Sequence, residues 1–267
     1  MTQPKIDTVK KSGTRFYCSP DDNEIRLPGV TSILNELPKP FLQYWRAKIC
    51  SEAALDNLEI LVSMALKGER DAAVDYLKKA PQRSTGNSAT IGSEVHDLCE
   101  RIARGEDVGR VHPDHRPYLD GFESFIKEFE PEFLFIEDTV WSDTHGYAGS
   151  FDALLKIDGE TIIADWKTTR SGVHAEVALQ LSAYANADHI IKPDGTKVDI
   201  PTVDSAMVCH LRPERTQLVP VSTDPQLFDT FLALRTVWEW SQTTSKRAVG
   251  KPVASWDIPT EEKKGKR

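Results

Sequence analysis

Asp165 and Lys167 stand at the end of an apolar run in TIIADWKTT, residues 161–169, and are the first candidates for chemistry. The residues Ile-Ile-Ala at 162–164 are typical of a strand that is buried on at least one face. Residues two apart on a strand project from the same face, so Asp165 and Lys167 share a face and Trp166 lies on the other. Charged side chains at the rim of such a strand need a partner or a task. This pair is therefore either a salt bridge or part of a functional site.

A second carboxylate is expected beside this pair. Asp-Gly at 158–159, between two apolar runs, predicts a two-residue hairpin turn. The register of that hairpin sets Asp152 opposite Asp165, with the Cβ atoms about 4.5–5.5 Å apart, and directly opposed like charges destabilise a sheet. Either a divalent cation between the carboxylates or a shared proton, which raises one pKa, would relieve the repulsion. The same register places Lys167 across from Ser150, where its ammonium group could orient a water or a phosphate oxygen.

Hydrophobic periodicity predicts the elements that hold these residues. Apolar side chains recur at helical spacing in residues 91–105 and again in a helix that carries Tyr118, Phe122, Phe125 and Phe129. Beyond that helix the period becomes that of strands. The expected elements are strands at 133–141, 147–157 and 161–167, a helix from about 174 to 190, strands at 203–211 and 215–221, and a helix at 224–242. This order predicts an α/β core with mixed strand pairing.

The flanking segments divide the chain into four parts. We expect an N-terminal hairpin and lead-in segment at 1–30, a helical cap at 31–90 that ends in a polar connector at 81–90, the core at 91–243, and a flexible basic tail at 244–267.

Composition narrows the functional classes. Hydrophobic residues make up 39% and charged residues 28% of the 267-residue chain. Such a chain can bury a core, and it has no apolar stretch near the roughly 20 residues that cross a bilayer. The net charge of -8 argues against a protein that coats nucleic acid, but it allows an enzyme that gathers acids around a metal. The N-terminus lacks the features of a signal or transit peptide, so we expect a cytoplasmic protein of a bacterial or phage-infected cell.

The four cysteines are widely scattered and form no CxxC pair. Neither a disulfide framework nor a zinc site is predicted, and buried reduced thiols are the expected state of Cys18, Cys50, Cys99 and Cys209.

Four motifs in order resemble those of the PD-(D/E)XK nuclease superfamily and, within it, the RecB-like nucleases. GYAGSFD at 146–152 followed by ADWKT at 164–168 is similar to the Asp and D/E-x-K pair of the superfamily. GSEVHDLCE at 92–100 resembles the RecB-like G-T-x-x-H-x-x-x-E helix, with Ser93 in place of Thr. QLSAY at 180–184 resembles the Q-x-x-x-Y helix. In addition, GVTSIL and FLQYWRAK resemble the N-terminal segment of phage-type and mitochondrial genome maintenance exonucleases, so that the resemblance covers about residues 28–240.

The resemblance implies a restriction-endonuclease-like core of a helix, a three-stranded meander, a helix and further strands, with an N-terminal helical cap. It implies that His96, Asp152 and Asp165 bind Mg²⁺ or Mn²⁺ together with the Trp166 carbonyl. Lys167 would position or deprotonate the attacking water and offset charge on the phosphate. This assignment agrees with the chemistry of metal-assisted phosphodiester hydrolysis.

Further residues have supporting roles under the same resemblance. Gln180 and Tyr184, four apart on one helix face, would brace the site or contact the DNA backbone. Glu100 would hold His96, bind a metal through water, or pair with a basic residue such as Arg101 or Arg104. Independently of the resemblance, Arg170, just past the strand, is either a solvated loop residue or a phosphate contact, and the second reading is preferred.

Some RecB-like relatives carry an iron–sulfur cluster, held by one Cys before the core and three near the C-terminus. Only Cys209 follows the core motifs here, so we expect no Fe-S cluster.

The expected function is therefore a metal-dependent DNA exonuclease that acts on single-stranded DNA or on free ends. Proteins of recombination or replication are the candidate partners. The alternatives are a structure-specific or restriction-type endonuclease on the same core, and a non-catalytic DNA-binding subunit. The joint presence of Asp152, Asp165 and Lys167 favours an enzyme, because a binding subunit has no reason to keep an unfavourable carboxylate pair.

Overall fold

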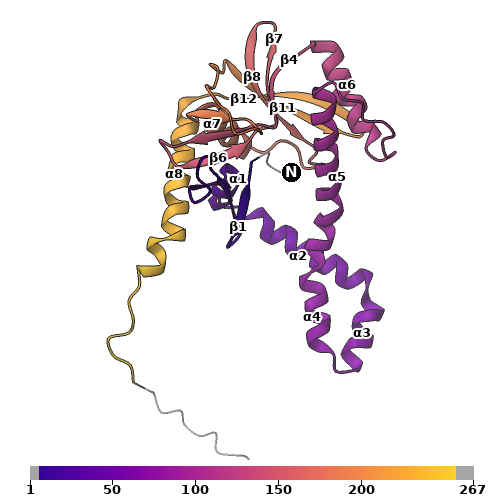
Figure 1. The fold of residues 1–267 in the computed structure, drawn as a ribbon. Coiled ribbons are helices and arrows are strands. Elements are labelled where there is room, and N and C mark those ends of the chain that lie inside the picture. The colour runs from indigo at the N-terminus through magenta and orange to yellow at the C-terminus, as the bar shows by residue number, and fades with distance from the viewer. Residues whose placement is uncertain (1–5, 257–267) are drawn as a thin grey trace, which may run out of the picture.

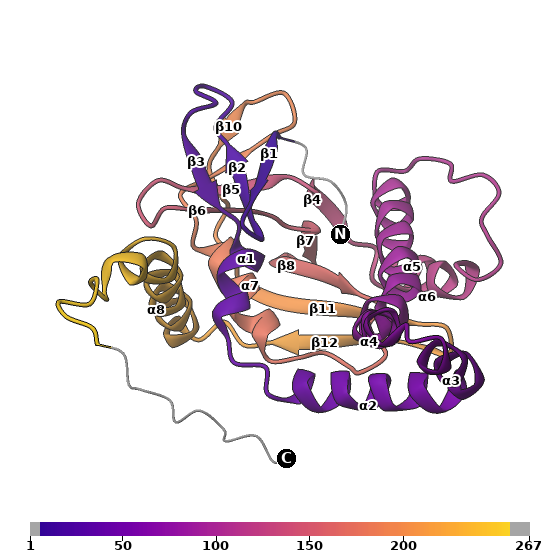
Figure 2. The same ribbon diagram turned by 90° about the horizontal axis from the view of Figure 1, so that it is seen from below.

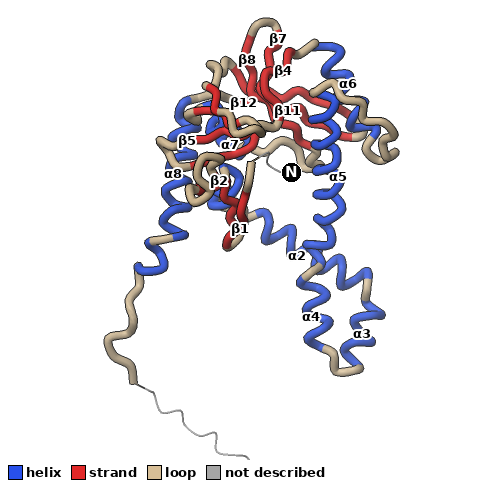
Figure 3. The backbone as a smooth tube through the Cα atoms, in the orientation of Figure 1, coloured by secondary structure: helices blue, strands red, loops and turns tan. Residues whose placement is uncertain are grey.

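A five-stranded mixed sheet forms the centre of the protein (Figures 1 and 3). The computed structural model describes residues 6–256, apart from the side chains of residues 87–89. The strand order is β12-β11-β8-β7-β4, with only β8 and β11 parallel among these neighbours. The bounds are β4 Glu132–Ile136, β7 Ala153–Ile157, β8 Glu160–Lys167, β11 Ser205–Arg212 and β12 Arg215–Val221. The prediction of an α/β protein with mixed pairing is confirmed.

Helices cover both faces of this sheet (Figure 1). Helices α5 (Ala80–Ala103) and α6 (Arg116–Phe129) pack on one face, and α7 (Glu176–Ala185) and α8 (Pro225–Gln242) pack on the other. Strand β8 contributes side chains to both helical layers, because successive residues point to opposite faces of the sheet. Ile163 packs with the α7–α8 layer, whereas Ala164 and Trp166 pack with the α5–α6 layer. Asp165, two residues after Ile163, therefore points to the same side of the sheet as α7. It lies near the end of a strand that is covered on both faces.

A second, four-stranded sheet stands beside the first in the order β10-β9-β5-β6. Its strands are β5 Thr139–Ser142, β6 Tyr147–Ser150, β9 His189–Ile191 and β10 Lys197–Val198. The predicted helix at 174–190 is too long, because α7 ends at Ala185 and the chain enters β9 four residues later.

The predicted single strands at 133–141 and 147–157 are wrong, since each is interrupted and passes from one sheet to the other. The first breaks at Glu137, which has a positive φ of 55°, and the second breaks at 151–152. The two breaks face each other. The Glu137 N–H donates to the Asp152 carbonyl at 3.0 Å, and the Phe151 N–H donates to the Asp138 carbonyl at 3.2 Å. Hydrogen bonding therefore continues through the crossover, and both breaks place acidic residues at the junction of the two sheets.

A three-stranded antiparallel sheet precedes the helices. It contains the predicted hairpin, β2 Thr14–Cys18 with β3 Arg26–Pro28, and adds β1 Thr8–Lys11 along the other edge of β2.

Most of the predicted helical cap, from α2 to α4, projects away from the sheets, whereas its first residues pack against the core (Figure 1). It comprises α1 Val30–Ile33, a 3-10 turn Leu34–Glu36, and helices α2 Phe41–Asp56, α3 Leu58–Leu66 and α4 Arg70–Lys78. None of the residues of α2, α3 and α4 is buried. This part of the chain is anchored at its two ends, by α1 against the core and by α5.

The predicted polar connector at 81–90 is wrong, because these residues form the first turns of α5. Pro81 suits the start of a helix, where its missing N–H costs nothing. The hydroxyls of Thr85 and Thr90 donate to the carbonyls of Pro81 and Gly86, each at 3.1 Å, so the polar side chains are satisfied inside the helix. The boundary expected between residues 90 and 91 falls within one continuous helix.

The segment expected to be a flexible basic tail begins with a 3-10 turn, Thr244–Arg247. Its last residues, 257–267, lie outside the described part of the chain. Across residues 6–256, no helix combines the length and apolarity needed to cross a membrane.

Candidate metal-binding and catalytic site

The hairpin that carries the two predicted carboxylates has the expected register. Asp158 and Gly159 form its turn with φ values of 51° and 86°, and β7 pairs with β8 as far as Ala153 opposite Ala164. Asp152 lies one residue beyond the end of this ladder. Its Oδ2 accepts a hydrogen bond from the Trp166 N–H at 2.5 Å. Asp152 and Asp165 are therefore not paired in the ladder as expected. Instead, the Asp152 carboxylate accepts a backbone hydrogen bond near the end of β8.

Ser150 is also placed differently from the prediction. It pairs with Thr139 in the four-stranded sheet, not with Lys167. Ser150 and Lys167 nevertheless line the same cavity, because the sheet junction brings β6 beside the end of β8.

Asp165 is held by two nitrogen groups on one face of the sheet. Its side chain is 3% exposed, and its oxygens lie 2.8 Å and 2.6 Å from Nζ of Lys167. Nε2 of Gln180 donates to Oδ1 at 3.1 Å and lies 3.2 Å from the hydroxyl of Tyr184. The salt bridge considered from the sequence is thus formed, and the helix motif around Gln180 braces it.

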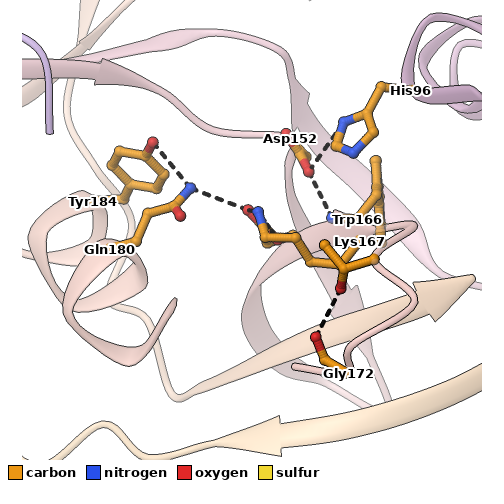
Figure 4. A network of polar contacts seen from close by, with 9 residues as sticks. His96, Asp152, Trp166, Lys167, Gly172, Gln180 and Tyr184 are labelled. Carbon is orange, nitrogen blue, oxygen red and sulfur yellow. Dashed lines mark hydrogen bonds and ion pairs between the residues drawn. The ribbon is translucent and has the colours of Figure 1, made fainter. Parts of the chain in front are cut away.

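His96 approaches the other carboxylate from helix α5 (Figure 4). Its Nδ1 lies 3.6 Å from Oδ2 of Asp152. The close approach of the helix to the end of β8 depends on Gly92, where a Cβ would lie 3.0 Å from Oγ1 of Thr168. A Cβ at this position would require Thr168 to shift by a few tenths of an ångström.

A third carboxylate, Glu137, joins the site and was missed by the sequence analysis. His96, Glu137 and Asp152 each offer a ligand atom, and these atoms lie within 4.8 Å of one another. Glu137 is 2% exposed at the break between β4 and β5. A signal for it exists in the sequence, because Glu137 follows the apolar run FLFI as Asp165 follows IIA. It was read as the interior of a continuous strand.

These groups line one small cavity of about 160 Å³. Its walls come from α5, the end of β8, the sheet junction, α7 and the N-terminal strand β2. The lining residues are Arg15, Tyr17, Thr31, His96, Glu137, Ser150, Asp152, Asp165, Lys167, Gln180 and Tyr184. Each predicted residue of the catalytic set, and both residues of the Q-x-x-x-Y motif, is therefore in this lining.

Three predicted residues do not line the cavity, and one of them is Trp166, whose carbonyl was expected to bind the metal. Glu100 and Arg170 are also absent from the described residues that line the cavity. Glu100 is buried and forms an ion pair with Arg104, with Oε1 3.1 Å from Nη2, which is one of the three roles considered for it. Arg170 lies exposed in the loop after β8, and its predicted contact with phosphate stays a prediction.

The Trp166 side chain points away from the cavity, as expected from strand alternation. It is 1% exposed and packs edge-to-face on Phe122, with ring centroids 5.0 Å apart. This contact fixes the backbone between Asp165 and Lys167.

Burial dominates the electrostatics of the cavity. Desolvation raises the pKa of Asp152 and that of Asp165, against the opposing effect of Lys167. Each carboxylate is thus less stable in its charged form than in water, and Asp152 further raises the pKa of Asp165. The Lys167 pKa is lowered by desolvation, but the two aspartates outweigh that effect and the net shift is upward. The cavity is lined by three carboxylates and two cationic groups, Lys167 and Arg15, which leaves an excess of negative charge when all are ionised. The carboxylate oxygens and the imidazole nitrogen form a donor set that fits Mn²⁺ or Mg²⁺.

His96 is held neutral and hence able to bind a metal. Burial lowers its pKa from 6.5 to about 4, although Asp165 acts in the opposite direction. Because the unfolded chain takes up this proton near pH 6.5, the folded state loses stability as pH falls from there toward 4, and nothing is lost above that window. We expect wild type in chelator to lose about 2 kcal/mol more unfolding free energy than His96→Gln between about pH 7.5 and pH 5, measured by urea denaturation.

The control for this measurement is His112→Gln, because the His112 side chain is 64% exposed. This variant should follow the pH dependence of wild type. Equal pH dependence of wild type and His96→Gln would show that the imidazole is not held neutral.

Gly149 sets the space available for Tyr184. A Cβ at this position would lie 2.6 Å from Cε1 of Tyr184 and 3.2 Å from Cγ2 of Val30. Overpacking of this kind costs about 1–3 kcal/mol, so Gly149→Ala should lower the unfolding free energy by that amount. Gly86→Ala is the matched control, since no atom lies within 4 Å of its added Cβ and helical Ala is favoured over Gly. Equal unfolding free energies of the two variants would mean that the Tyr184 ring can move to accommodate a Cβ at position 149.

Comparison of the sequence with protein-family models and with curated proteins found no match. What can be said of function therefore depends on the cavity itself.

Proposed function

We propose that the protein is a metal-dependent deoxyribonuclease that hydrolyses phosphodiester bonds, acting as an exonuclease on single-stranded DNA or on free ends. One observation carries the proposal. A single small cavity gathers an imidazole, three carboxylates, two of them buried, and a lysine at the end of β8, the central strand of the mixed sheet. A structural salt bridge accounts for Asp165 and Lys167, but it gives no reason for His96, Glu137 and Asp152 to converge beside them.

The residues fit a divalent cation. In this proposal His96, Glu137, Asp152 and Asp165 hold Mg²⁺ or Mn²⁺, with the Trp166 carbonyl as a further oxygen donor. A bound cation of this kind polarises a phosphate oxygen and makes a water more acidic. The mixture of imidazole and carboxylate favours Mn²⁺, because Mg²⁺ prefers oxygen ligands.

Lys167 has the position required of a group that assists attack on a phosphodiester. Its ammonium lies on Asp165 at the cavity wall and keeps its charge, since the neighbouring aspartates raise its pKa. Placed there, it can orient a water or offset the charge that grows on the phosphate oxygens. Gln180 fixes the carboxylate that holds this lysine, and Tyr184 holds Gln180. These two residues therefore position Lys167 through Asp165.

The element order supports a restriction-endonuclease-like core of the RecB type. Helix α5 supplies the histidine, the β7–β8 hairpin supplies the two aspartates and the lysine, and α7 supplies the Q-x-x-x-Y motif. The acidic motif also includes Glu137, which the resemblance did not place. The preference for ends is carried by the sequence resemblance alone.

The test is digestion of three DNA substrates with Mn²⁺ and with chelator. Linear duplex, end-labelled single strands and a covalently closed circular duplex are incubated with the full chain. We expect nucleotides to be released from the linear substrates only, and only with metal. Cleavage of the closed circle would show that the protein is an endonuclease and not an exonuclease. Binding of DNA without cleavage of any substrate would refute the proposal that the protein is an enzyme.

A further inference from the structure

The hairpin of β1 and β2 presents two different faces. On one face Phe16 packs edge-to-face on Trp238 of α8, with ring centroids 5.9 Å apart. On the other face Tyr17 and Arg15 line the catalytic cavity. Lys10 is directly opposite Arg15 in the strand register, so it belongs to the cavity face. Lys11, opposite Thr14, belongs to the other face.

The Lys10–Arg15 pair is unfavourable on structural grounds. Directly opposed like charges destabilise an antiparallel pair. Among the described residues, no carboxylate forms an ion pair with either side chain. Lys10 is exposed and Arg15 is half-buried. A hairpin that needed only to fold would not carry two cations at this position, whereas an anion between them would remove the repulsion.

A groove of about 380 Å³ runs beside this pair and continues the catalytic cavity. The two share Arg15, Thr31 and Gln180 in their linings. The outer part adds Lys10 together with Lys39, whose ammonium lies 3.0 Å from Oε2 of Glu176. The groove thus carries three cations and one carboxylate in a protein with a net charge of -8.

The geometry points to a second phosphate site. We propose that Lys10 and Arg15 bind the phosphate group of the nucleic-acid strand next to the one being hydrolysed, with the backbone lying along the groove from Lys10 to Gln180. Figure 2 shows the β1–β2 hairpin beside α1, whose Thr31 lines both parts of this path. The hairpin therefore positions the strand, and Lys167 acts on the phosphate in the cavity. This inference rests on the proposed nuclease function.

The experiment compares wild type with Lys10→Gln, Arg15→Gln and the double variant, with Lys11→Gln as the matched control from the same strand. Binding of a fluorescent single-stranded oligonucleotide is measured by anisotropy at several salt concentrations, with Ca²⁺ in place of Mn²⁺. The double variant should bind roughly tenfold more weakly, and the slope of log K against log salt should fall by about 0.7 for the lost phosphate contact. In the cleavage assay with Mn²⁺, KM should rise while kcat is largely retained for Lys10→Gln.

Thermal melts separate binding from folding. Loss of a like-charge pair predicts that Lys10→Gln is at least as stable as wild type. Oligonucleotides with and without a terminal phosphate distinguish the two sources of the anion. If the double variant loses affinity equally for both oligonucleotides, the bound group is an internal phosphate. If it loses affinity only for the phosphorylated oligonucleotide, the bound group is the terminal phosphate.

The outcomes distinguish this inference from the nuclease proposal. If wild type cleaves DNA and the double variant matches Lys11→Gln in affinity and salt slope, the phosphate site is refuted and the nuclease stands. If wild type neither binds nor cleaves DNA, the nuclease proposal fails, and the groove site fails with it.

Discussion

Lys167→Met should cleave DNA roughly a thousandfold more slowly than wild type at saturating Mn²⁺, and Asp165→Asn should be at least as impaired. Met keeps the length of the lysine but removes the charge that lies 2.6 Å from Oδ2 of Asp165. Asn keeps the shape of the carboxylate and can still accept from Gln180, but it removes a charge needed to hold a cation. Initial rates on an end-labelled single strand measure both effects.

The matched control for the lysine is Lys156→Met, which changes a lysine of the same hairpin. Lys156 pairs with Thr161 in the ladder and does not line the cavity. Its variant should retain the activity of wild type. A Lys167→Met protein with near wild-type turnover would remove this lysine from the chemistry and leave a structural salt bridge.

Mn²⁺ in the absence of DNA should raise the melting temperature. A ligand that binds only the folded state adds about 2.7 kcal/mol at one hundred times its Kd. Asp152→Asn should abolish most of this response, because it removes one of the carboxylates that line the cavity. In chelator the same variant should be at least as stable as wild type, since burial raises the pKa of Asp152 and makes its charged form unfavourable at neutral pH. The Asn oxygen can still accept from the Trp166 N–H.

Asp158→Asn is the control for the metal response. It lies in the turn of the same hairpin with a positive φ, which Asn tolerates well. Its melting temperature should rise with Mn²⁺ as that of wild type does. A variant Asp152→Asn that is clearly less stable than wild type in chelator would mean that the carboxylate is a structural cap on β8, not a metal ligand.

The hairpin shows how far local sequence rules reach. Asp158-Gly159 specifies a two-residue turn, and the turn fixes the register of β7 against β8. That information placed Asp165 and Lys167 on one face and Asp152 near them. It failed one residue beyond the ladder, because the position of Asp152 is decided by a hydrogen bond from Trp166 and by the crossover between two sheets.

The part of the site that could not be predicted depends on non-local contacts. Glu137 lines the cavity because the chain passes from one sheet to another between β4 and β5. A positive φ is usually signalled in a sequence by glycine, but here the residue is a glutamate. The start of α5 was missed for a different reason. Ser, Thr and Asn are typical of loops, but at 81–90 threonine hydroxyls bond back to the helix carbonyls. Tertiary structure alone therefore adds Glu137 to the candidate metal site and nearly three turns to the helix that carries His96.

Mn²⁺ can be located in the cavity by its anomalous scattering. Crystals of the full chain grown with Mn²⁺ and without DNA would be measured above the manganese absorption edge. We expect a single strong anomalous peak bounded by His96, Glu137, Asp152 and Asp165, absent from crystals grown with chelator. Anomalous density found only at surface carboxylates, with the cavity empty and Lys167 still on Asp165, would contradict the metal-dependent nuclease.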